Sequence, residues 1–200
     1  MSTDTLLHTF TSVIEPLRLE ELFARQQPTE LEIGCGDGAF LLGHAQAHPK
    51  RNFVGVERLL GRIRKLDKRG LRAGLENLRL LRFEARYLVE YLLPTGRFEA
   101  VHIYFPDPWP KDRHARNRLV NETFPDHAAR LLRPGGVVHL RTDSVPYSTQ
   151  MQEVFQAHGG FKLEDTPVDL KKRITEFEAV FNTNGVPIRH DSWRLPGAAE

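Results

Sequence analysis

The sequence is poor in cysteine and contains no long apolar run. A single thiol, Cys35, excludes an internal disulfide and a structural zinc site built on several cysteines. No stretch reaches the roughly 18 consecutive apolar residues of a membrane-spanning helix. Asp4, Glu15 and Pro16 lie where a secretory signal needs a basic and then an apolar segment. We therefore expect a reduced, cytoplasmic protein that has no membrane partner and binds no metal.

The 200 residues correspond to one ordinary domain. Hydrophobic types make up 40% and charged types 27% of the chain, which is typical of a globular rather than a disordered protein. The sequence shows no internal repeat, no low-complexity tract and no linker. We predict a short N-terminal leader at 1–29 followed by a single domain at 30–200.

Neither sign of charge is in excess, because 28 Lys and Arg oppose 26 Asp and Glu for a net charge of +2. Such a total does not by itself predict a polyanionic partner, but local charge decides that question. Two segments, 58–72 and 111–118, are strongly basic and each contains one acid, Asp67 or Asp112. Either cluster alone would fit a solvated surface, whereas two clusters near an acidic ligand site favour a surface that binds phosphates.

Short apolar segments alternate with amphipathic ones along the chain. The pattern predicts strands at 30–33, 52–56, 77–83, 100–105 and 137–141, and helices at 39–48, 59–73, 85–93, 119–132 and 147–158. The run at 134–136, Pro-Gly-Gly, is typical of a stop and turn. Shorter segments are expected at 161–163 and 175–181, with a last strand at 188–195. This order predicts an α/β fold with a doubly wound, mostly parallel sheet and an antiparallel last strand.

Acidic side chains follow the ends of the predicted strands. Ligands of doubly wound sheets bind beyond the carboxyl ends of the strands. Glu32 lies within the first strand, and the acids that follow the next four strands are Glu57, Glu84, Asp107 and Asp143. We expect these carboxylates to gather around one ligand.

The first strand runs into a glycine-rich turn, Gly34-Cys35-Gly36-Asp37-Gly38. Nicotinamide, flavin and S-adenosylmethionine (SAM) binders all use such turns. Here the third glycine follows at a shorter interval than in the dinucleotide pattern, and Asp37 would repel a pyrophosphate. SAM carries no phosphate but has a sulfonium and an amino group, so acids near the turn favour SAM. Glu57 suits the ribose hydroxyls of either cofactor.

The segment 103–120 is the most specific of the chain. Phe105-Pro106-Asp107-Pro108-Trp109, then Lys111 and Arg113-His114, resembles the tRNA (guanine-N7)-methyltransferase family, a group of class I SAM-dependent methyltransferases with a Rossmann-like fold. The resemblance extends over about residues 30–195. Its further segments are 31–36, 55–57, Thr142-Asp143 with Pro146-Tyr147, and Thr175-Glu176-Phe177-Glu178.

The resemblance implies a role for each matching position. Glu32, Glu57, Glu84 and Asp107, with Gly34, Gly36 and Gly38, would bind SAM, and Asp107 would also be the catalytic residue. Lys111, Asp143, Thr175, Glu176, Phe177 and Glu178 would bind the tRNA substrate, at guanine 46 of the variable loop. Arg113 and Arg116 are expected to hold phosphates beside the methylated base. The family usually has Asp where this chain has Glu84.

Methylation at guanine N7 needs no deprotonation and no cysteine nucleophile, in agreement with a lone Cys35 between glycines. Three alternatives stay open: a noncatalytic SAM- and RNA-binding module, N7 or amino methylation of another RNA, and a nicotinamide-dependent oxidoreductase. His44 and His48 lie one helical turn apart without an evident third metal ligand, so we expect a solvated helix face. The oligomeric state, monomer or homodimer, is open.

Overall fold

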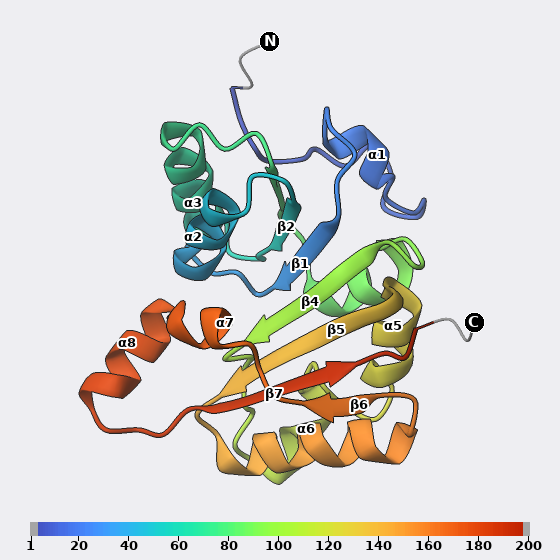
Figure 1. The fold of residues 1–200 in the computed structure, drawn as a ribbon, viewed down its shortest axis with the longest axis vertical. Helices are drawn as coiled ribbons and strands as arrows, with labels where there is room; N and C mark the ends of the chain where they lie inside the picture. The colour runs from blue at the N-terminus through green and yellow to red at the C-terminus, as the bar shows by residue number, and fades with distance from the viewer. Residues whose placement is uncertain (1–3, 198–200) are drawn as a thin grey trace.

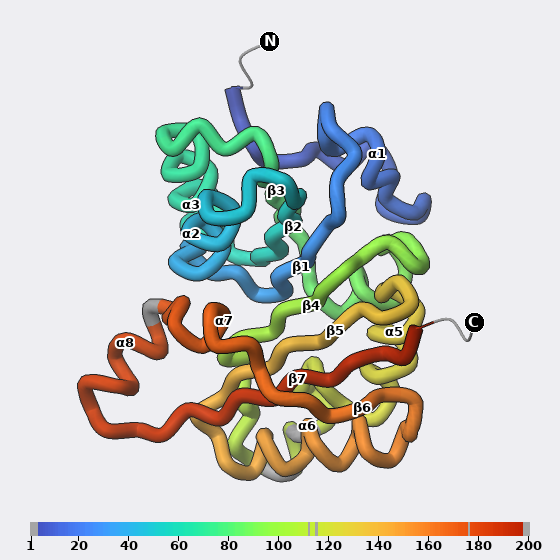
Figure 2. The backbone as a smooth tube through the Cα atoms, in the orientation of Figure 1, coloured from blue at the N-terminus to red at the C-terminus, as the bar shows by residue number. Residues whose placement is uncertain are grey.

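Within residues 4–197, the part of the chain that the computed structural model describes, seven strands form one sheet in the order β3-β2-β1-β4-β5-β7-β6 (Figure 1). The strands are β1 (Thr29–Ile33), β2 (Asn52–Val56), β3 (Leu78–Leu81), β4 (Phe98–Tyr104), β5 (Leu132–Thr142), β6 (Lys162–Glu164) and β7 (Arg189–Arg194). Strand β7 runs antiparallel to β5 and β6, and the other neighbours are parallel. Figure 2 shows the chain returning through β7 between β5 and β6. The predicted fold class is confirmed.

Helices connect the strands and cover the sheet. They are α1 (Leu19–Leu22), α2 (Ala39–Ala47), α3 (Leu60–Arg72), α4 (Ala85–Tyr87), α5 (Phe124–Leu131), α6 (Val145–His158), α7 (Val168–Lys172) and α8 (Glu176–Thr183). A π-helical turn, η1 (Leu88–Leu92), extends α4, and a 3₁₀ segment, η2 (Asp112–Asn117), follows the loop after β4. The side chains of Asp112, Ala115 and Glu176 lie outside what the structure describes. No helix in the described part of the chain is long and apolar enough to cross a membrane.

The two faces of the sheet differ in polarity. One face carries apolar side chains such as Leu31, Ile103 and Leu140, which pack with α5 and α6 in the larger core cluster. The opposite face carries alternate residues of the same strands, among them Glu30, Glu32, His102, His139 and Arg141, all buried. Strand residues alternate between faces, so one buried face is polar. This polar face lies under α2, α7 and α8.

Local signals explain where several helices begin and end. Helix α3 buries Ile63 and Leu66 at helical spacing in the second core cluster and exposes its charged residues. Helix α6 begins with the Ser144 hydroxyl accepting from the Tyr147 backbone N–H, and it ends at Gly159, which has φ 69°.

The start of one predicted helix differs from the structure. The helix expected over 119–132 is α5 at Phe124–Leu131, with Pro125 in its first turn, where proline is well tolerated. As the stop signal at 134–136 predicts, α5 ends just before it, at Leu131. The run itself forms an irregularity near the start of β5, between the pairs Leu132–Phe98 and Val137–Ala100, with Gly135 at φ 78°.

The predicted leader, 1–29, packs onto the same core as the rest of the chain over its described part. Leu6 and Leu17 are buried, and Leu7 forms a parallel bridge with Leu80 beside β3. The Leu80 carbonyl accepts from the His8 backbone N–H at 2.9 Å.

Candidate functional site

The carboxyl ends of five parallel strands meet at one edge of the sheet, beside α8 (Figure 1). The strands lie side by side in the order β3, β2, β1, β4 and β5. The acids at or near their carboxyl ends therefore follow one another in a row along this edge. From β3 to β5 these acids are Glu84, Glu57, Glu32, Asp107 and Asp143. Glu32 and Glu57 are buried, Asp143 is half-buried, and Glu84 and Asp107 are exposed.

The glycine turn connects β1 to α2. The N–H groups of Gly34 and Cys35 both donate to the Val56 carbonyl at 2.9 Å, which ties the turn to β2. Gly38 has φ 80°, and a Cβ there would lie 2.2 Å from Leu66 Cδ1. Only glycine fits this close approach of α2 and α3. Cys35 is buried, and burial raises the pKa of its thiol well above the usual value, as suits a packing residue.

Glu32 is 3% exposed, and its Oε2 has no hydrogen-bond partner within the described residues. Burial raises the pKa of this carboxyl to about 8, although the charge of Arg141 acts in the opposite direction. A buried carboxyl with an unsatisfied oxygen needs a partner, and a cation would satisfy it best.

Glu57 and Glu84 also support local structure. Glu57 Oε1 accepts from the Leu59 N–H at 2.7 Å, immediately before α3. Both oxygens of Glu84 cap α4, accepting from the N–H groups of Arg86 at 3.0 Å and Tyr87 at 2.8 Å. The carboxylate of Glu84 that is expected to bind SAM thus also caps a helix, a contact that the sequence alone did not indicate.

Asp107 lies in a constrained corner. Phe105 has φ 51° and Trp109 has φ 42°, and both are non-glycine residues in the left-handed region. Such conformations persist only where the surroundings enforce them, and they concentrate at functional sites. Because Asp107 lies between two prolines as well, its backbone has little freedom.

Arg118 enforces this corner. Arg118 belongs to the basic segment 111–118, which we expect to lie on the surface. For Arg118 that expectation is wrong, because the residue is only 7% exposed. Its Nε donates to the Pro108 carbonyl at 2.7 Å, its Nη1 donates to Gln150, and its guanidinium lies 5.1 Å from the centre of the Tyr147 ring. One buried arginine therefore holds the backbone beside Asp107 against α6.

The remaining bases of this segment are exposed. Lys111, Arg113 and Arg116 lie on and just before η2. The Arg86 guanidinium donates to the backbone carbonyls of Arg116 at 3.1 Å and Arg118 at 3.2 Å. Because Glu84 caps the helix that carries Arg86, the acid after β3 is connected to the basic segment after β4.

Helix α8 is tied to the same edge. Thr175 and Glu178 form a reciprocal capping box at its start. Glu178 is buried, and its Oε2 accepts from Arg141 Nη1 at 2.8 Å, while its Oε1 lies 3.5 Å from His190 Nε2. Phe177 is 50% exposed and its ring centre lies 6.1 Å from that of Phe105, beside Asp107. The side chain of Glu176, also expected to bind substrate, lies outside the described residues.

A cluster of histidines lies beneath the site. The expectation that His44 is solvated is wrong, since it is 4% exposed and donates from Nε2 to Glu30 Oε2 at 3.0 Å. His102 donates to the same oxygen at 2.9 Å, and Arg51 donates to Glu30 Oε1 at 2.7 Å. The ligand atoms of Glu30, His44 and His102 lie within 4.8 Å of one another, close enough to hold a metal ion. These donors satisfy both oxygens of the Glu30 carboxylate, whereas the buried Nδ1 of His44 has no hydrogen-bond partner within the described residues.

Comparisons with known proteins show which proteins this chain is similar to. A family model described as "Putative methyltransferase" matches residues 26–190. A tRNA (guanine-N(7)-)-methyltransferase of Nitrosococcus oceani is 39% identical over 181 residues, covering 90% of this chain and 75% of that protein. One of Cronobacter sakazakii is 36% identical over 186 residues, covering 90% and 76%. The crystal structure of the 16S rRNA methyltransferase KamB is similar in fold, with TM-score 0.65 at 19% identity over 88% of this chain and 92% of that chain.

The chain has a doubly wound sheet like that of KamB, and the family model places it in the class of methyltransferases. Within that class, the identity to curated relatives over nine tenths of the chain decides the family. The chain belongs to the tRNA (guanine-N7)-methyltransferase family and is an enzyme of that family.

Proposed function

We propose that the protein transfers the methyl group of SAM to N7 of a guanine in tRNA, at guanine 46 of the variable loop. The observation that carries this proposal is the row of five acids along one sheet edge, with Asp107 held in a rigid corner among them. The tRNA (guanine-N7)-methyltransferase relatives support the base and the atom that is methylated.

The described residues fit SAM. Glu32 offers a buried carboxyl with an unsatisfied oxygen, which matches a cationic group of the cofactor. Glu57 and Glu84 would take the ribose and the adenine, and the turn is open at Gly34 and Gly36, where a Cβ would meet no atom within 4 Å. When bound, SAM supplies an electrophilic methyl group. Its positive charge fits a row of carboxylates, whereas the pyrophosphate of a nicotinamide cofactor would be repelled.

Asp107 would act on the purine. Neutral guanine N7 presents an in-plane lone pair, so no general base is required. As N7 becomes methylated the purine gains positive charge, and its N1–H and N2–H become better donors. A fixed carboxylate that accepts from them binds the transition state more tightly than the ground state, which raises the rate. The contacts of Arg118 with the Pro108 carbonyl and Gln150 hold the backbone beside this carboxylate.

We assign the substrate contacts to three segments. Lys111, Arg113 and Arg116 are exposed cations that follow the corner, and they would bind the phosphates that flank an extruded base. Asp143, after β5, and the segment Thr175–Glu178 would supply the other contacts. In that segment we assign direct contact to the exposed Phe177, while Glu178 keeps α8 in position through Arg141.

Mapping of 7-methylguanine tests the proposal. Purified protein is incubated with SAM and tRNA transcripts, and the RNA is then reduced with borohydride and cleaved with aniline. We expect cleavage at guanine 46 and none in a matched transcript with adenine there. tRNA binding without cleavage would instead favour the noncatalytic module, and cleavage confined to ribosomal RNA would favour another substrate.

A further inference from the structure

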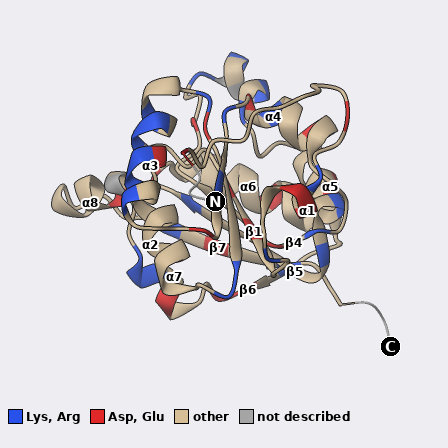
Figure 3. Ribbon diagram, turned by 90° about the horizontal axis from the view of Figure 1, so that it is seen from above, with Lys and Arg blue, Asp and Glu red and all other residues tan. Residues whose placement is uncertain are grey.

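Helix α3 is rich in Lys and Arg (Figure 3). Six bases of this helix, Arg62, Arg64, Lys65, Lys68, Arg69 and Arg72, are exposed. The one acid, Asp67, faces the N-terminal segment, where it accepts from the Leu6 N–H at 2.6 Å and the Thr5 hydroxyl at 3.0 Å. Asp67 therefore does not neutralise the outward side.

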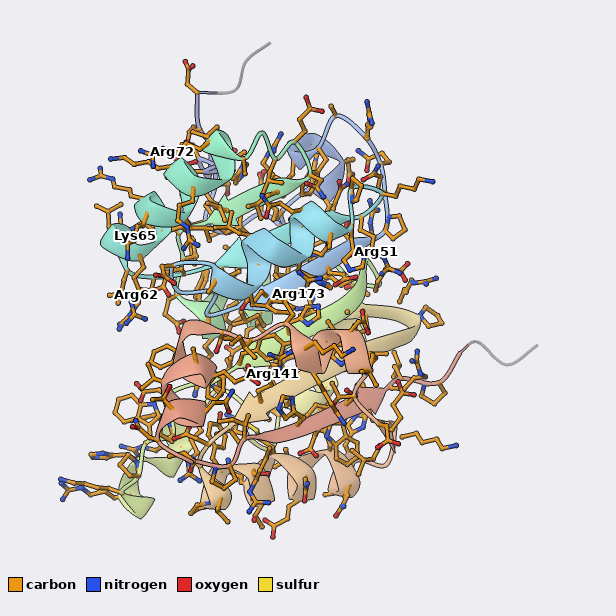
Figure 4. The ribbon with its side chains drawn as sticks, turned by 60° about the vertical axis from the view of Figure 1, so that its left-hand side comes forward. Arg51, Arg62, Lys65, Arg72, Arg141 and Arg173 are labelled. Atoms are coloured by element: carbon orange, nitrogen blue, oxygen red, sulfur yellow. The ribbon has the colours of Figure 1, made fainter. Side chains whose placement is uncertain are left out.

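Four of these bases form a row. Arg62, Lys65, Arg69 and Arg72 follow one another at intervals of three or four residues, so they lie on one side of the helix. Figure 4 shows Arg62, Lys65 and Arg72 along that side, with Arg62 nearest α8. The row extends over about 15 Å, at roughly 1.5 Å of helix per residue.

The positive charges of α3 contribute little to the stability of the fold. Like charges at these spacings destabilise a helix, and cations near its N-terminus oppose the helix dipole. Within the described residues, the only ion pair of these bases joins Lys65 to Asp37 at 3.4 Å, and Arg69 donates to the Asp37 carbonyl at 3.0 Å. An unfavourable row of cations with so few internal partners is expected where an external polyanion supplies further ones.

The position of the row identifies the polyanion. Asp37 belongs to the glycine turn, so the row passes directly beside the candidate cofactor site. The apolar side of α3, with Ile63 and Leu66, is buried in the core. A helix that binds a membrane surface needs that side exposed. The charge without the exposed apolar side favours a nucleic acid over a lipid surface.

We propose that the outward side of α3 binds the phosphate backbone of the tRNA at nucleotides away from the methylated guanine, so that it sets affinity for whole tRNA. This inference rests on the proposed function. The row and the bases of η2 would contact the substrate at two separate places, and a short RNA would reach only the bases of η2.

The test uses the full chain with the triple substitution Arg62→Gln, Lys68→Gln and Arg72→Gln, which leaves both contacts to Asp37 intact. The matched control is Arg25→Gln, Lys50→Gln and Lys162→Gln, which removes the same charge from exposed residues near the amino edge of the sheet. Binding is measured by fluorescence anisotropy against salt, for whole tRNA and for a short hairpin that carries the same guanine.

We expect the α3 variant to bind whole tRNA about tenfold more weakly or worse, with the salt slope reduced by about 0.7–0.9 for each lost phosphate contact. Hairpin affinity and the kcat at saturating tRNA should stay at the wild-type value, and the control should behave as wild type. Unchanged tRNA affinity, equal loss for the hairpin, or loss confined to anionic phosphatidylserine vesicles would overturn the inference. Failure of the wild type to methylate tRNA would overturn the proposed function instead.

Discussion

Arg141 and Glu178 form a buried ion pair between β5 and α8, with Nη1 and Oε2 2.8 Å apart. The same guanidinium donates to the backbone carbonyls of Arg173 at 2.8 Å and Leu170 at 2.5 Å, and it lies 4.1 Å from the centre of the Tyr104 ring. One strand residue thus attaches both α7 and α8 to the sheet, beside the corner that carries Asp107.

Arg141→Met should therefore destabilise the protein and loosen the substrate side of the site. Removal of one partner leaves Glu178 buried without its counter-charge, at a cost of about 3–5 kcal/mol. Urea unfolding should show this loss, and the KM for tRNA should rise. The matched control is Arg194→Met, which breaks the more exposed pair with Glu164 and should cost about 1 kcal/mol or less. Equal small losses for both variants would contradict the role of Arg141.

SAM binding should release a proton through Glu32. The pKa of this carboxyl is raised to about 8 by burial, so it is largely protonated at pH 7, whereas a cationic ligand requires the carboxylate. Affinity should rise with pH up to about 8, by up to about tenfold per unit. Calorimetry at pH 7 in buffers of different ionisation enthalpy counts the protons. Glu32→Gln should abolish the release, and release by the variant equal to that of wild type would exclude Glu32 as its source.

Arg118→Lys should impair catalysis more than cofactor binding. Lysine keeps the charge but cannot hold the Pro108 carbonyl and Gln150 at once, so the corner around Asp107 becomes mobile. A misplacement of about 1 Å costs up to about 100-fold in rate. We expect kcat to fall about 10- to 100-fold with unchanged SAM affinity. Arg116→Lys, which keeps a charge at an exposed position, is the control and should retain its kcat; an equal loss in both variants would argue against a positioning role.

The buried histidines should make the fold sensitive to acid. Burial lowers the pKa of His102 and of His139, whereas in the unfolded chain histidine takes up a proton near pH 6.5. The unfolded state then binds more protons below that pH, so the free energy of unfolding falls as pH drops, by about 1.4 kcal/mol per unit for each such histidine. Although burial alone would raise it, hydrogen bonds from His102 and His44 hold the pKa of Glu30 well below its usual range, which adds to the loss at lower pH.

Urea unfolding at pH 7.5 and 5.5 measures this loss. His139→Asn should reduce the loss of stability between the two pH values, because the asparagine amide can replace the hydrogen bond of His139 Nδ1 with Ser192 but does not take up a proton. His127→Asn on α5 should show the same loss as wild type. A loss of stability independent of the substitution at position 139 would show that other groups are responsible.

Much of the fold and of the site's edge follows from local sequence. Alternating apolar segments predict the parallel sheet, and the acids at strand ends, from Glu32 to Asp143, become neighbours because parallel strands end at one edge. The glycine turn and the corner at Asp107 are also recognisable in the sequence, because the residues of each are consecutive.

The supporting contacts could not be predicted in this way. Arg118 meets Gln150 across 32 positions, and Arg141 meets Glu178 across 37. In sequence both arginines resemble ordinary surface cations, and His44 resembles a solvated helix residue. Their burial depends on which elements lie over the polar face of the sheet, and the chain order of α7 and α8 does not reveal that. Alternation of apolar and polar residues along a strand normally indicates that the polar face is exposed, so the pattern does not reveal that this polar face is buried.

The single-turnover rate of Asp107→Asn at saturating SAM and tRNA shows whether the Asp107 carboxylate takes part in methyl transfer, because asparagine keeps the size of the side chain and removes its charge. If this carboxylate stabilises the methylated purine as charge develops, the rate of N7 methylation should fall about 100-fold or more, comparable to the loss of one preorganised group. A rate near that of the unaltered protein would contradict the account.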